Sequence, residues 1–307
     1  HEEAVQCYNK AISLDENNVH AWSNKGISLR NLGKHEEALE CFDRVISLDE
    51  NNAEAWFQKG FTLGYLGKYQ DGIDCFDRVI SIDENHADGW LYKGHASQVI
   101  GKHEEALDCF DRVISLDENN VDGWYSKGQA LRFLKKYEEA VSCSDKAISI
   151  DENNAEAWNN KGLALYYLKK YEEALSCFDK AISIDENNAE AWNSKGELLN
   201  YLEKNEEALS CFDKLISLDE NNVGAMITNG EILFDLENYS KARYYFDNVL
   251  KIDESNQTAW EYKCLISSRF GMYDKAIELC NEALTKTDSI KIRQILEDIT
   301  NYQNQSK

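Results

Sequence analysis

The stretch that decides the fold is residues 155–188, AEAWNNKGLALYYLKKYEEALSCFDKAISIDENN. Its second half carries a stripe of apolar and small residues at spacings of three and four, as one face of a helix requires. The first half carries a similar stripe, and residues 169–171 separate the two. The first stripe consists of Ala157, Trp158, Gly162, Leu165 and Leu168. The stretch therefore predicts a hairpin of two amphipathic helices.

The same pattern recurs every 34 residues along almost the whole chain. Tryptophan, glycine, alanine and phenylalanine each form a ladder at this interval, and coincident ladders mark a structural repeat. The tryptophan ladder is Trp22, Trp56, Trp90, Trp124, Trp158 and Trp192, and Trp260 resumes it after Met226. We expect residues 1–18 to hold the second helix of a partial repeat. Eight repeats should follow over residues 19–290, starting at 19, 53, 87, 121, 155, 189, 223 and 257, and residues 289–303 should form a capping helix.

A single hairpin cannot bury both of its apolar faces, so the repeats must stack on one another. Glycine or alanine at the helix crossings lets two backbones approach closely, and the tryptophan and phenylalanine ladders fill the space between hairpins. The sequence therefore predicts an all-α fold, an α-solenoid of stacked 34-residue helix-turn-helix repeats.

At this point the pattern resembles the tetratricopeptide repeat family, and the resemblance covers nearly the whole chain. One repeat shows every matching position: Trp158, Gly162, Leu165, Tyr171, Ala174, Phe178 and Ala181. The resemblance implies a right-handed superhelix and a non-enzymatic scaffold for protein–protein interaction. Its ligands would be extended peptide or protein segments bound on the concave face, which the first helices line.

The chain departs from the family pattern in two ladders. Glutamate stands where the family commonly has proline after the second helix, and the chain contains no proline at all. We expect the Asp-Glu-Asn-Asn segments to end each second helix by side-chain capping, with asparagine in the left-handed conformation. Lysine stands just before the glycine, as at Lys59 and Lys161. We predict that these lysines lay their stems on the core and aim their ammonium groups at the preceding Asp-Glu turn.

Charge and cysteine spacing exclude several classes of function. The net charge is −23 and no basic cluster is present, which disfavours nucleic acids and anionic membrane surfaces as partners. Seven of the nine cysteines recur every 34 residues, so stacking would hold them about 10 Å apart. That is too far for disulfides, and free thiols indicate a reducing, intracellular and cytoplasmic setting. No histidine pair has helical metal-ligand spacing, so we expect no metal and no cofactor.

Function should lie where the repeats differ. On the first helix, the most variable positions lie one, two, five, eight and nine residues after the tryptophan. Amides there could bind a ligand backbone, and aromatic rings could supply apolar contact. An acidic row two residues before the tryptophan would favour ligands with basic residues. The candidate peptide-binding residues are Asn24, Phe57, Gln58, Phe61, Tyr65, Tyr92, Tyr125, Arg132, Asn159, Asn160, Tyr166 and Asn193.

Two alternatives stay open at this stage. The array could be the regulatory or substrate-recruiting part of a larger enzyme. It could also be a structural module that self-associates end to end, because stacked solenoid ends can propagate. Adaptors for chaperone tails grip carboxylates with a basic clamp, and no pair of repeats here assembles one.

Overall fold

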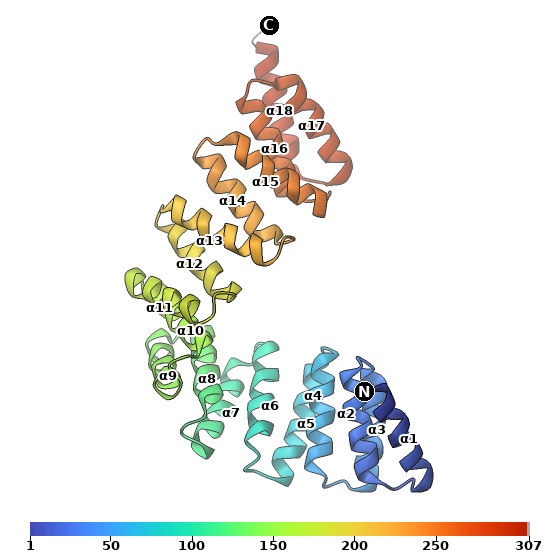
Figure 1. Ribbon diagram of the computed structural model, residues 1–307. Helices are drawn as coiled ribbons and strands as arrows, with labels where there is room; N and C mark the ends of the chain where they lie inside the picture. The colour runs from blue at the N-terminus through green and yellow to red at the C-terminus, as the bar shows by residue number, and fades with distance from the viewer. Residues whose placement is uncertain (306–307) are drawn as a thin grey trace. The chain divides into compact units, whose positions relative to one another are not determined.

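The computed structural model describes residues 1–305, and that part of the chain contains only helices and the turns between them. The prediction of an all-α helical repeat solenoid is confirmed. The chain divides into two compact units, which we describe separately: unit 1 is His1–Lys170 and unit 2 begins at Tyr171. Within each unit, helices that follow one another in the chain pack side by side (Figure 1).

The helices of unit 1 are α1 (Glu2–Leu14), α2 (Val19–Asn31), α3 (His35–Leu48), α4 (Ala53–Tyr65), α5 (Tyr69–Ile82), α6 (Ala87–Val99), α7 (His103–Leu116), α8 (Val121–Phe133), α9 (Tyr137–Ile150) and α10 (Ala155–Tyr167). Those of unit 2 are α11 (Tyr171–Ile184), α12 (Ala189–Tyr201), α13 (Asn205–Leu218), α14 (Val223–Asp235), α15 (Tyr239–Ile252), α16 (Gln257–Arg269), α17 (Tyr273–Lys286) and α18 (Ile290–Gln305). None of the helices in this described range is long and apolar enough to cross a membrane.

The asparagines of the Asp-Glu-Asn-Asn segments cap the helix that follows, as predicted, but the second helix before them ends with a backbone hydrogen bond and not with the predicted side-chain cap. The Asn52 side-chain oxygen accepts a hydrogen bond from the backbone N–H of Ala55 at 2.9 Å, which caps α4. Asp49, at the end of α3, accepts one from the backbone N–H of Asn51 at 3.1 Å. The expected left-handed asparagine is wrong, because α3 ends at Asp49 in an extended conformation with φ of −148°. An extended residue ends the helix without a left-handed turn.

Left-handed residues occur instead in the turn inside each repeat. Glycine takes this conformation at four such turns, and lysine or glutamate takes it at four others, with φ between 57° and 81°. Residues with a β-carbon are strained there by about 1 kcal/mol, because the β-carbon crowds the following carbonyl oxygen. The non-glycine residues are Lys135, Lys169, Glu203 and Glu237.

Each tryptophan of the ladder holds the turn before its own helix. The Trp56 indole N–H donates to the backbone carbonyl of Glu50 at 3.0 Å. All seven tryptophans make this bond to the glutamate of the preceding turn, at 2.8–3.0 Å. The glutamates at the family's proline position therefore contribute a backbone acceptor, while their side chains remain exposed at the surface.

The lysine ladder finds acidic partners, but not the predicted ones. Lys59 Nζ lies 2.6 Å from Asp43 Oδ1 and 5.4 Å from the centre of the Trp56 ring. Asp43 follows Phe42 in the second helix of the preceding repeat, and is not part of the Asp-Glu turn. The turn's aspartate is already engaged by its own backbone cap. The same pairing recurs at Lys93, Lys127, Lys161, Lys195 and Lys263, at 2.5–2.7 Å.

The core of most repeats is the contact between the glycine and phenylalanine ladders. A β-carbon placed on Gly94 would lie 2.5 Å from Cε1 of Phe110, and one on Gly26 would lie 2.7 Å from the same atom of Phe42. Both phenylalanines are fully buried. Only glycine leaves room for a ring at this crossing, so the two ladders depend on each other.

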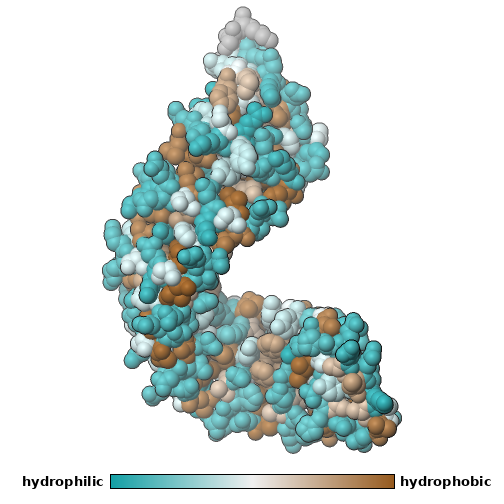
Figure 2. Space-filling view, in the orientation of Figure 1, coloured by the Kyte–Doolittle hydropathy of each residue, from teal (hydrophilic) through white to brown (hydrophobic). Residues whose placement is uncertain are grey.

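All nine cysteines are free thiols, and only Cys7 is exposed. Burial raises the pKa of Cys75 to about 11 and that of Cys109 to about 12, so both remain protonated near neutral pH. The cysteine ladder is therefore a row of small buried side chains. Hydrophilic side chains cover most of the face seen in Figure 2, with apolar ones scattered between them.

Thiol reactivity should separate Cys7 from the rest. At mildly alkaline pH we expect a disulfide reagent to modify Cys7 quickly in the folded protein. The eight buried thiols should react only after denaturant exposes them, because the thiolate is the reactive form. The measurement is the number of thiols titrated before and after unfolding. Fast reaction of several thiols in the folded protein would contradict the buried ladder.

Replacing a strained residue by glycine should stabilise the repeat. We expect Lys135→Gly to raise the free energy of unfolding by about 0.5–1 kcal/mol, since it removes the strain of a positive φ at a cost in chain entropy. The reverse change at the equivalent turn, Gly101→Lys, should lower it by a similar amount. Urea unfolding of both variants measures these free energies. A change of the same sign in the two variants would refute the prediction.

Candidate functional site

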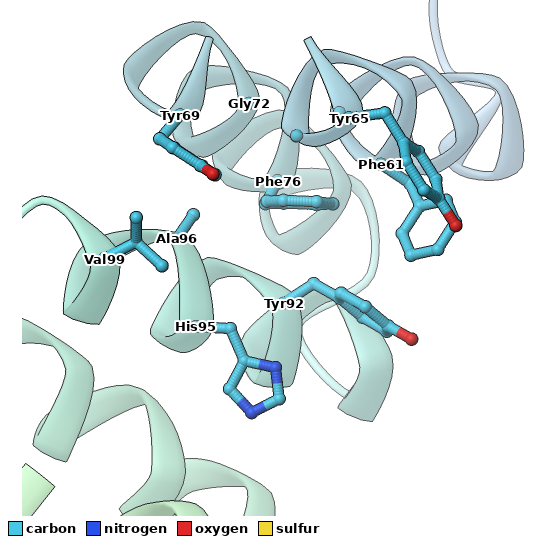
Figure 3. A pocket seen from close by; sticks show the side chains of 11 residues that line it. Phe61, Tyr65, Tyr69, Gly72, Phe76, Tyr92, His95, Ala96 and Val99 are labelled. Atoms are coloured by element: carbon cyan, nitrogen blue, oxygen red, sulfur yellow. The ribbon is translucent and has the colours of Figure 1, made fainter. Parts of the chain in front are cut away.

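In unit 1, α4, α5 and α6 enclose a cavity of about 270 Å³, which we call the anchor pocket (Figure 3). Its walls are mostly aromatic, and the space lies between side chains of all three helices. The rings come from Phe61 and Tyr65 of α4, Tyr69 and Phe76 of α5, and Tyr92 and His95 of α6. Such a concave, apolar and already formed cavity is typical of a binding site.

Two glycines of repeat 2, Gly64 and Gly72, line the pocket. Gly64 stands eight residues after Trp56, and a β-carbon on Gly64 would have no other atom within 4 Å. Gly72 stands in the alanine ladder on α5. At the position of Gly64, the other repeats carry Arg30, Gln98, Arg132, Tyr166, Asn200, Phe234 and Ser268. Gly64 therefore leaves open space, whereas a β-carbon on Gly72 would lie 3.2 Å from the Gly60 carbonyl oxygen.

Packing between the rings fixes the walls of the pocket. The Phe61 ring meets Tyr65 edge to face with centroids 5.2 Å apart, and it meets Tyr92 in the same way at 5.1 Å. Phe57 packs on Tyr92 at 5.5 Å. Because each ring is held by its neighbours, a ligand would enter a preorganised cavity with little loss of side-chain entropy.

Polar side chains surround one edge of this aromatic group. The Arg30 guanidinium lies 4.9 Å from the centre of the Phe61 ring and donates a short hydrogen bond to Gln58. Gln58 in turn donates to Glu54 at 2.6 Å. The structure thus brings together five sequence-predicted residues, namely Phe57, Gln58, Phe61, Tyr65 and Tyr92.

His95 is a wall residue outside the twelve predicted binding residues. Its Nε2 lies 2.9 Å from the Ser126 hydroxyl oxygen. Burial lowers the pKa of His95 below its usual value, and Asp122 opposes the shift only in part. The imidazole is therefore neutral at pH 7. Burial also raises the pKa of Tyr92, with Asp88 and Asp122 adding to the shift. The pocket is uncharged inside and has carboxylates nearby.

For two of the predicted binding amides, Asn159 and Asn160, the prediction is wrong. Asn159 and Asn160 are only 3% and 2% exposed, so neither amide is available to a ligand. Asn160 donates to the Ser144 hydroxyl at 3.0 Å and accepts from Arg132 Nε at 3.2 Å. Ser144 replaces a phenylalanine of the ladder, and the Asn160 amide occupies the vacated space next to Gly128. These asparagines belong to the core.

The remaining predicted residues lie apart from the pocket. The exposed Asn24 on α2 donates to the His20 carbonyl at 2.9 Å. Tyr125 on α8 accepts from Gln129, and Tyr166 on α10 packs against Tyr167. Asn193 is exposed on α12 in unit 2 and donates to Glu197.

The missed residues had a signal in the sequence. Tyr69 and Phe76 are ordinary ladder positions, whereas His95 stands at a variable position and Gly72 departs from the alanine ladder. A residue at the same repeat position as Gly64 also lines a cavity in unit 2. There Ser268 faces a space of about 470 Å³ between α16, α17 and α18, with Arg269 and Asp298 in its walls. No group of three His, Cys, Asp or Glu side chains within residues 1–305 is placed to hold a metal ion.

Two glycines of α4 should respond to alanine in opposite directions. Gly64→Ala should raise the free energy of unfolding by about 0.8 kcal/mol, because alanine favours the helix and its methyl group meets nothing. Gly60→Ala should lower it by about 1–3 kcal/mol, because the new β-carbon would lie 2.9 Å from the Phe76 ring. Urea unfolding of the pair measures both, and a destabilising Gly64→Ala would mean that the pocket is not empty.

Family models of a known repeat match this chain along much of its length. Models described as tetratricopeptide repeat match residues 19–52, 53–86, 87–120, 109–142, 155–188 and 177–210. A model described as TPR repeat matches residues 1–33 and 128–169, so that together the matches span residues 1–210. A search of curated proteins gave no match.

Several solved structures share the fold. YrrB, titled a TPR protein with an unusual peptide-binding site, is 24% identical with a TM-score of 0.53, covering 62% of this chain and 98% of its own. MamA is 26% identical with a TM-score of 0.50, covering 53% and 96%. A tetratricopeptide repeat protein of Parabacteroides merdae is 16% identical with a TM-score of 0.65, covering 81% and 98%. With its matched repeats and its helix pairs, the chain belongs to the tetratricopeptide repeat family.

Proposed function

We propose that this chain is a non-enzymatic scaffold for protein–protein interaction, and that unit 1 binds an extended segment of a partner protein. The binding surface would be the first-helix face of unit 1, which we define as the variable positions of α2, α4, α6, α8 and α10. The family and the fold of its solved neighbours support an interaction scaffold in general terms. The choice of face rests on the residues of this chain.

The anchor pocket is the observation that carries the proposal. Phe61, Gly64, Tyr65, Tyr92 and His95 all stand at variable positions of the first helices. The ladder residues are used for packing between helices. The pocket is lined in part by the variable positions, which packing does not fix. Tyr65 is 62% exposed, so this wall meets solvent. A partner's apolar side chain is the group that such a cavity accommodates.

The energetics favour an anchor of this kind. Burying a leucine, methionine or phenylalanine side chain contributes about 1.5–3 kcal/mol. One such residue therefore changes affinity by about tenfold to a hundredfold. Between α6 and α8, the Gln98 side-chain amide donates to the Gln129 amide oxygen at 3.3 Å, so the apolar anchor, and not these amides, carries the proposed affinity.

A plugged pocket provides the test. Gly64→Leu places a side chain in open space, on a helix that prefers leucine to glycine, so the variant should be at least as stable as the original. Asn200→Leu is the matched control, because Asn200 is exposed at the same repeat position on α12. Both variants and the original chain would be used to select binders from a displayed library of random peptides.

We expect the original chain to select peptides that share an apolar residue. Gly64→Leu should bind these peptides at least about tenfold more weakly, and Asn200→Leu should bind them unchanged. Dissociation constants from isothermal titration calorimetry measure the effect. Unchanged binding by a folded Gly64→Leu variant would exclude the pocket as the anchor site, and a library without binders would argue against the scaffold function.

A further inference from the structure

The surroundings of the anchor pocket specify the chemistry of its partner, given the function proposed above. Asp88 and Asp122 lie in the first turns of α6 and α8, at the same repeat position, and both are exposed. Both carboxylates act on the Tyr92 hydroxyl, and Asp122 also acts on His95. Since Tyr92 and His95 are walls of the pocket, a ligand seated there lies within electrostatic reach of these acids.

Glu156 continues the series at the same position in the first turn of α10. We call these three acids the acidic row. The two arginines on the first-helix face of unit 1 do not neutralise it. Arg30 is held by Gln58 and the Phe61 ring. Arg132 is held by Asn160 and lies 4.9 Å from the centre of the Phe133 ring. Three exposed carboxylates, one on each first helix, therefore remain available to a cationic partner.

The spacing of the row restricts the partner's conformation. The first helices α6, α8 and α10 contact one another in sequence, and packed helices lie about 8–10 Å apart. A β-strand returns to the same face every second residue, after about 6.6 Å, which is too short. A polyproline II helix returns to the same face every third residue, after about 9 Å. Of these two extended conformations, polyproline II is the one whose repeat matches the spacing of successive helices.

We propose that the anchor pocket takes an apolar side chain of a polyproline II segment that carries lysine or arginine at every third position. The apolar residue enters between α4, α5 and α6. The basic residues reach Asp88, Asp122 and Glu156 in turn. Polyproline II is a conformation that unfolded chains already populate, so such a segment could come from a disordered region of a partner protein.

Three synthetic peptides test the register. The first carries three lysines at every third position and a phenylalanine beside the first lysine. The second has the same composition with its three lysines adjacent, and the third replaces the phenylalanine by alanine. We expect the first to bind most tightly, the second about threefold or more weaker, and the third about tenfold or more weaker. Raising the salt from about 0.1 M to about 1 M should weaken the first, because the ion pairs are exposed.

Variants of the chain test the acidic row. Asp122→Asn should weaken the first peptide about threefold. Glu138→Gln is the matched control, because Glu138 is also an exposed acid in the first turn of a helix, but on a second helix, α9. It should leave binding unchanged. Circular dichroism of both variants excludes loss of helix as the cause.

The outcomes separate this inference from the proposed function. If the first two peptides bind equally and Gly64→Leu weakens both, the pocket function stands and the inferred register is wrong. If Asp122→Asn binds no more weakly than Glu138→Gln, the acidic row does not contact the ligand and the inference falls. If neither lysine peptide binds while library peptides do, the basic partner is excluded. If library peptides fail as well, the proposed function falls with it.

Discussion

The close contact between a glycine and a phenylalanine ring is the constraint on which most of the repeats depend. At Gly94 and Gly26 the ring lies where a β-carbon would stand, so the two helices of a hairpin can cross with their backbones close together. The crossing sets where the next first helix can pack. A tryptophan of that helix then fixes the preceding turn through a hydrogen bond to a backbone carbonyl. Glycine, phenylalanine and tryptophan thus form a series of contacts that links each such repeat to the next.

Where the pattern departs from this constraint, the departures are compensated in pairs. Ser144 replaces a phenylalanine, and the Asn160 amide fills the space and hydrogen-bonds to it. Asn229 replaces a ladder lysine, and it shares Asp213 with the hydroxyl of Tyr245. In the last repeat, Cys264 and Cys280 replace glycine and phenylalanine, and both are fully buried. Where one substitution leaves a carboxylate without its lysine, a second substitution supplies a hydrogen-bond donor. Where one leaves an empty space, a second fills it.

The anchor pocket differs because its loss is not compensated. Gly64 removes a side chain that other repeats carry, and no neighbour moves in to fill the room. Leaving a cavity costs stability, since the rings around it lose contacts. The rings remain in place because they hold one another edge to face. An unfilled cavity with fixed aromatic walls is a feature that packing does not require, and this is the reason to connect it with binding.

The sequence by itself determined the repeat, its helices and the asparagine caps at the start of the first helices, because these depend on spacings of three, four and 34 residues and on side chains that bond to neighbouring backbone atoms. It also placed Phe57, Phe61, Tyr65 and Tyr92 among twelve candidate binding residues at variable positions of the first helices, but it did not group them. Only the tertiary structure decided which lysine meets which aspartate, which asparagines are buried, and where a pocket opens. Those outcomes depend on which atoms of different repeats occupy the same space. A periodic sequence pattern predicts the same contacts for every repeat, and only the packing of the actual side chains shows where the repeats differ.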